Sequence, residues 1–75
     1  MDSKRLTTEE IKKLAFGIAS LNQDQRETVR QTLHRLASDG TVWRRELHLE
    51  LRKLKEAGTI SEIDRKAVEA AVFGS

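Results

Sequence analysis

The chain has 75 residues, of which 37% are hydrophobic and 35% charged, and its formal net charge is +2. This length forms one domain, residues 1–75, and the apolar content is too high and too regularly spaced for a disordered segment. The sequence has no cysteine, which excludes a disulfide framework and a thiolate metal site, and it has neither a secretory signal nor the roughly 20 consecutive apolar residues that cross a bilayer, so we expect a cytoplasmic protein with no membrane partner.

Two helices are predicted in the first half of the chain, over residues 8–20 and 23–38. Each begins with a capping box. In this motif the side chain of the cap residue accepts a hydrogen bond from the amide three residues later, and the Glu or Gln side chain at that position accepts one from the amide of the cap residue. The capping pairs are Thr7 with Glu10 and Asn22 with Gln25. The apolar residues at helical spacing are Ile11, Leu14, Ile18 and Leu21 in the first helix and Val29, Leu33 and Leu36 in the second.

A phrase that occurs twice divides the second half of the chain: Leu36-x-x-x-Gly40-Thr41-Val42, then Leu54-x-x-x-Gly58-Thr59-Ile60. Glycine takes the left-handed conformation that ends a helix, and a following Thr or Ser accepts the first amides of the next helix. Each phrase therefore predicts a helix stop joined to a helix start.

The third and fourth helices are predicted over residues 42–56 and 61–73. Thr41 starts the third helix, and Ser61 with Asp64 caps the fourth. Their apolar faces are Trp43, Leu47, Leu51 and Leu54 in the third helix and Ile63, Ala67, Ala70, Ala71 and Val72 in the fourth. The fold class is therefore all-α: a small four-helix bundle, or three long helices plus a short one, with short glycine-capped turns.

The run from Leu51 to Asp64, Leu-Arg-Lys-Leu-Lys-Glu-Ala-Gly-Thr-Ile-Ser-Glu-Ile-Asp, resembles the short helical hairpins called SHOCT domains. Those pair a Leu-x-x-Leu-Lys helix with a glycine turn that leads into a second helix. The resemblance implies a helical hairpin in this part of the chain, and we carry no function across from it.

No motif in the sequence predicts catalysis. The two histidines, His34 and His48, are not at the i, i+4 spacing of a helical metal site, and no glycine-rich phosphate loop or nucleophile elbow is present. Glu46 and Glu50 lie one helical turn apart, but neighbouring basic residues favour a salt-linked solvated edge. We therefore expect no enzymatic activity, no metal, no cofactor and no small-molecule substrate.

Three large apolar side chains stand out on helical wheels. Phe16 projects opposite the apolar face of the first helix, and Leu49 projects nearly opposite that of the third, with Val42 on the same side as Leu49. Phe16 and Leu49 belong either to a second core seam or to an interface with another chain. Trp43 lies at the edge of its stripe, so we expect it in the core with its indole nitrogen outward, and base stacking or partner anchoring is the alternative.

A basic face lies beside the apolar stripe of the third helix. Its residues are Arg44, His48, Arg52 and Lys55, with Arg45 close by. Such a face could contact phosphates along a nucleic acid, or it could be an ordinary solvated helix face. We favour the solvated face, because acidic residues dilute the positive field on the same helix.

The expected function is therefore a non-enzymatic helical module for protein–protein interaction, a regulator or adaptor that binds a partner protein or self-associates as a homodimer. Phe16, Leu49 and Trp43 would anchor the contact, with basic residues at its rim. A nucleic-acid-binding regulator that uses the basic face is the alternative, and a structural subunit of a larger assembly is a third option.

Overall fold

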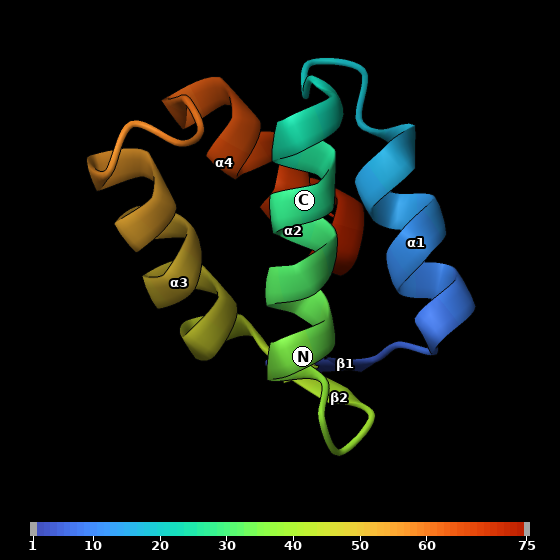
Figure 1. Cartoon of the computed structure of the whole chain (residues 1–75). Helices are drawn as coiled ribbons and strands as arrows, with labels where there is room; N and C mark the ends of the chain where they lie inside the picture. Colours follow the sequence, from blue (N-terminus) through green and yellow to red (C-terminus); the bar gives the residue numbers. More distant parts are fainter. Residues whose placement is uncertain (1, 75) are drawn as a thin grey trace.

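The computed structural model describes residues 2–74, which form four helices and one two-stranded ribbon (Figure 1). The elements in chain order are β1 (Ser3–Arg5), α1 (Thr8–Gly17), α2 (Gln23–Leu36), β2 (Thr41–Trp43), α3 (Arg44–Glu56) and α4 (Glu62–Phe73). In Figure 1, α2 lies between α1 and α3, α4 passes behind α2, and the ribbon lies at the lower end of the bundle. The small, mostly helical class that the sequence predicts is confirmed.

Three of the four helices begin with the predicted capping boxes. The cap side chain accepts from the amide three residues on at 3.2 Å for Thr7, 2.8 Å for Asn22 and 3.1 Å for Ser61, and in each box the side chain of that third residue accepts from the cap amide. Each box satisfies two amides that the helix itself leaves free. These short-range bonds explain why the starts of α1, α2 and α4 are predicted within one residue.

The ends of the first two helices differ from the prediction. The first helix ends at Gly17 and not at residue 20, because Ile18 takes an extended conformation and its side chain enters the core. The second helix ends at Leu36 and not at residue 38, and a turn in which Gly40 donates to the Ala37 carbonyl at 2.8 Å follows. Ile18 is thus buried from an extended backbone, and the helical spacing of the sequence does not reveal that α1 has already ended.

The ribbon corrects the prediction that Thr41 starts a helix. Residues 41–43 form β2, which pairs antiparallel with β1 so that Lys4 lies opposite Val42. A β-branched pair followed by an aromatic residue suits a strand, and Gly40, with φ of 90°, turns the chain toward β1. The third helix therefore begins at Arg44 and not at residue 42.

The second glycine phrase joins two helices as predicted. Gly58 has φ of 78°, and the Thr59 amide donates to the Leu54 carbonyl at 2.9 Å, which closes the end of α3. Ser61 then caps α4, so α3, the turn and α4 form the expected helical hairpin. The same phrase thus precedes a strand at one site and a helix at the other.

The core lies between the four helices and the ribbon. Its buried apolar residues are Leu6, Ile11, Ala15, Ile18, Leu21, Val29, Leu33, Val42, Leu47, Leu51, Ile60, Val68 and Val72. The predicted positions of the Val42 and Ile63 side chains are wrong. Val42 is fully buried, because the alternation of β2 turns it inward, and Ile63 is 73% exposed, because α4 buries the stripe that runs through Asp64 and Val68. Among the described residues, no helix is both long enough and apolar enough to cross a membrane.

Candidate functional site

Two large apolar side chains remain exposed at α3. Leu49 is 48% exposed on the outer side of the helix, as the wheel predicts, and Trp43, the residue before the helix, is 49% exposed. The expectation that Trp43 lies in the core is wrong, because Val42 occupies the inward position of β2 and the next side chain points outward. Both residues are therefore available for contact with another molecule.

Phe16 does not join them at the surface. It is partly buried and packs against the core cluster, so of its two alternatives the core seam is correct. The helix that carries it contacts both α2 and α4, and a helix placed between two neighbours buries more than one stripe. We therefore remove Phe16 from the candidate partner-binding residues.

An open pocket of about 540 Å³ lies where β2 meets α3 and α4. It is lined by Asp2, Trp43, Arg44, Arg45, His48 and Glu69. Arg44 also packs its guanidinium carbon 4.5 Å from the centroid of the Phe73 ring, a cation–π contact between α3 and α4. The pocket thus combines an exposed indole ring with basic side chains.

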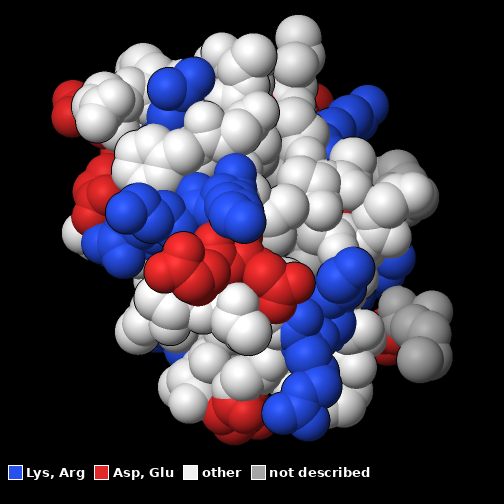
Figure 2. All heavy atoms as spheres, turned by 90° about the vertical axis from the view of Figure 1, so that its right-hand side faces the viewer, with Lys and Arg blue, Asp and Glu red and all other residues white. Residues whose placement is uncertain are grey.

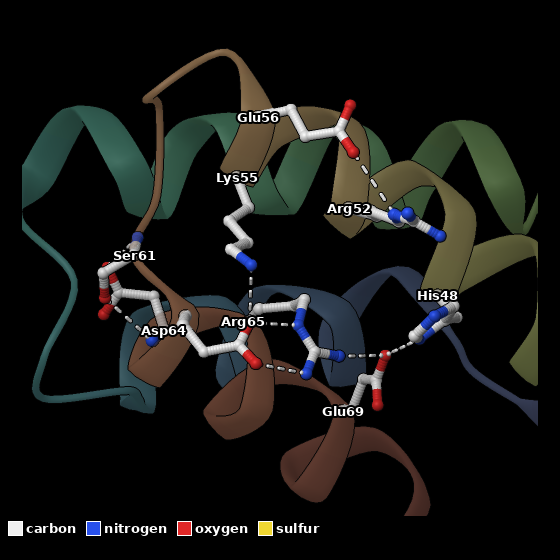
Figure 3. Close-up of polar contacts among 9 residues, drawn as sticks. His48, Arg52, Lys55, Glu56, Ser61, Asp64, Arg65 and Glu69 are labelled. Carbon is white, nitrogen blue, oxygen red and sulfur yellow. Dashed lines mark hydrogen bonds and ion pairs between the residues drawn. The ribbon is translucent and has the colours of Figure 1, made fainter.

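A chain of ion pairs, with one contact between a histidine ring and a carboxylate, joins α3 to α4 beside this pocket, and we call it the charge seam (Figure 3). Its members are His48, Lys55, Glu62, Arg65 and Glu69. Glu69 lies 2.8 Å from His48 and 3.1 Å from Arg65, and Glu62 lies 2.7 Å from Arg65 and 3.5 Å from Lys55. Hydrogen bonds from Arg65, helped by the charges of Arg65 and Lys55, lower the pKa of Glu62 to about 2.

The sequence contains a signal for the charge seam that the sequence prediction did not use. His48 and Lys55 are seven residues apart, and so are Glu62 and Glu69. A separation of seven residues is two helical turns, so each pair lies on one face of its helix. When α3 and α4 form a hairpin, the acidic pair of α4 meets the basic pair of α3.

The charge seam changes the interpretation of the basic face. His48 and Lys55 contact carboxylates of α4, Arg52 contacts Glu56 at 3.2 Å, and Arg44 stacks on an aromatic ring. Within residues 2–74, Arg45 is the one member of the face for which the structure records neither an ion pair nor a cation–π contact. Four of the five members of the basic face therefore already have a local partner within the protein.

The opposite side of the molecule, which Figure 2 shows over α1, also has mixed charges. Lys and Arg side chains form separate groups there, and a group of Asp and Glu side chains lies between two of them. Alternating charge of this kind gives no extended positive field on this face.

Within residues 2–74, no three His, Asp or Glu side chains are close enough together to hold a metal ion. No family model, curated protein or solved structure matches the chain. The candidate site is therefore defined by its geometry: Trp43, Arg45 and Leu49, which we call the α3 surface, and the pocket at its Trp43 end.

Proposed function

We propose that this chain is a small non-enzymatic interaction module, a regulator or adaptor, and that it binds a partner protein through the α3 surface. The observation that carries the proposal is the half-exposure of two large apolar side chains, Trp43 and Leu49, at one helix of a domain whose other helices bury most of theirs. Large apolar and aromatic side chains supply most of the binding energy at protein interfaces.

Arg45 connects the two apolar members of the α3 surface. Arg45 lines the pocket together with Trp43, and it lies one turn before Leu49, at the i, i+4 spacing that places two side chains side by side. An arginine between two apolar anchors is a composition typical of protein interfaces, where Trp and Arg are enriched. One partner segment could therefore contact all three residues.

The nucleic-acid alternative has less support from the geometry. A protein that follows a phosphate backbone gains affinity from each cation that releases a counterion, so it needs several unpaired cations in a row. Here His48 and Lys55 contact carboxylates of the charge seam and Arg52 pairs with Glu56, so most side chains of the basic face already have a partner. Self-association through the α3 surface remains within the proposal, with a second copy of the chain as the partner.

The test is a display selection from a random peptide library on the immobilised protein, after which the binding of each enriched peptide to the Leu49→Asp variant is measured. Enriched peptides that bind the original chain and not the variant would support the proposal. Sedimentation of both proteins would show in parallel whether the chain forms a dimer that the substitution disrupts. A monomeric chain that enriches no peptide, or enriches peptides indifferent to Leu49→Asp, would refute it.

A further inference from the structure

We propose that the α3 surface recognises an acidic peptide segment that carries one large apolar side chain. In this arrangement the apolar side chain packs against Trp43 in the pocket, and an adjacent carboxylate pairs with Arg45. The inference rests on the proposed function and adds the chemistry of the partner to it.

The charge argument starts from the pocket lining. Arg44 and Arg45 share the pocket with the carboxylates of Asp2 and Glu69, but Glu69 is held by His48 at 2.8 Å and by Arg65 at 3.1 Å. Within the charge seam, Lys55 and Arg65 balance Glu62 and Glu69. Arg44 and Arg45 then face the single carboxylate of Asp2, which leaves an excess of positive charge at the pocket. Arg45 is exposed and has no ion pair among the described residues, so a ligand meets this excess positive charge at Arg45.

The start of α3 adds to this field. The first residues of a helix carry partial positive charge from their free amides. The other three helices have a capping box that satisfies two such amides, whereas Trp43, the cap of α3, makes no side-chain cap bond, and at this helix start the Arg44 amide donates to the Asp2 carbonyl at 2.7 Å. The pocket and this helix start share Trp43, Arg44 and Arg45, so the field of the helix reinforces that of Arg45.

The apolar argument rests on Trp43 and Leu49. An indole ring that is half exposed offers a flat apolar face, and an arginine beside it favours a ligand with both an apolar and an acidic group. Leu49, one turn beyond Arg45, provides a second apolar contact for the same segment. This pattern fits a peptide better than a nucleic acid, since one unpaired arginine neutralises one phosphate and not a run of them.

The experiment uses three synthetic peptides of about eight residues with blocked ends and an RNA of about twelve unpaired nucleotides. The first peptide has a central leucine among Asp and Glu, the second replaces the leucine by alanine, and the third replaces the acids by lysine. Trp43 is the only tryptophan, so its fluorescence reports directly on the pocket. We expect the first peptide to bind at least about tenfold more tightly than the other two and the RNA.

Two variants make the assignment specific. Arg45→Ala should weaken binding of the acidic leucine peptide about fivefold, as expected for an exposed charge pair. Lys53→Ala is the matched control on the same helix, because Lys53 already pairs with Glu50 at 3.6 Å and does not line the pocket, and it should leave binding unchanged.

Several outcomes would overturn the inference. They are equal or tighter binding of the lysine peptide or the RNA, equal losses in the two variants, or no fluorescence change with any peptide up to about 1 mM. Each of these outcomes refutes the inference about the acidic peptide, and the display selection still tests the proposed function separately. If that selection enriches peptides that need Leu49 but are not acidic, the function stands and this inference is wrong.

Discussion

The same truncation should lower the stability of the protein much more at one leucine of α3 than at another leucine two residues away. Leu47 is fully buried, with 0% of its surface exposed, whereas Leu49 is 48% exposed on the outer side of the helix. The substitutions Leu47→Ala and Leu49→Ala remove the same atoms and end in the residue with the highest helix propensity. Any difference between the two variants therefore reports on burial alone.

The expected difference is large for a domain of this size. Truncation of a buried leucine costs about 3 kcal/mol or more, because apolar contacts are lost and a cavity remains. A chain of this length has a total stability of about 4–11 kcal/mol, so Leu47→Ala should remove a substantial part of it and lower Tm by about 12–24 °C. At the exposed position, Leu49→Ala should change the stability by less than about 0.5 kcal/mol.

Thermal and urea unfolding followed by circular dichroism would measure both values, with an unchanged urea m value as the control for two-state behaviour. Equal destabilisation by the two substitutions would refute the reasoning. It would mean that Leu49 is buried in solution, and the α3 surface would lose its main apolar residue.

Three further predictions concern the turns, the charge seam and α4. Gly58→Ala should cost about 1 kcal/mol because φ is 78° there, whereas Gly17→Ala, where an added Cβ meets no heavy atom within 4 Å, should gain about 0.5 kcal/mol in urea unfolding. The pKa of Glu62 falls from 4.5 to about 2 beside Arg65, so its contribution to stability is present above pH 4.5 and lost as the pH falls toward 2. Glu62→Gln should therefore reduce the loss of stability that is measured as the pH is lowered over this interval. Ile63→Lys should leave Tm within a few degrees, since a side chain that is 73% exposed contributes little to the core, and a large loss would mean that α4 packs differently.

The parts of the fold that the sequence predicts well depend on neighbouring residues. Capping boxes join residues three apart, so Thr7 with Glu10 and Ser61 with Asp64 can be recognised without knowledge of the rest of the chain. The periodic stripes that place Leu47 and Leu51 in the core are equally local.

The ribbon could not be recognised in this way. The first strand is Ser3-Lys4-Arg5, a polar segment with no strand periodicity, and it pairs with residues almost forty positions further along the chain. Pairing of this kind depends on the tertiary arrangement, which overrides the local preference of Thr41 for a helix start. The missed strand also explains the wrong placement of Val42 and Trp43.

The sequence predicts only part of the candidate site, because the rest of it also depends on the tertiary arrangement. A helical wheel shows that Leu49 faces away from the stripe of its own helix, but it does not show which neighbours cover the remaining faces. Phe16 projects from its stripe just as Leu49 does, yet it is partly buried because α1 has helices on more than one side. The counter-charges of the basic face likewise depend on how α4 folds back on α3.

The most direct test of the proposed function is the affinity of the most enriched display peptide for two variants, measured by calorimetry. Leu49→Asp places a charge on the α3 surface, and Ile63→Asp places the same charge at a more exposed apolar residue of α4. The proposal predicts that both variants stay folded, that Leu49→Asp weakens binding by at least about tenfold, and that Ile63→Asp has no effect. Equal affinity of the two folded variants would contradict it.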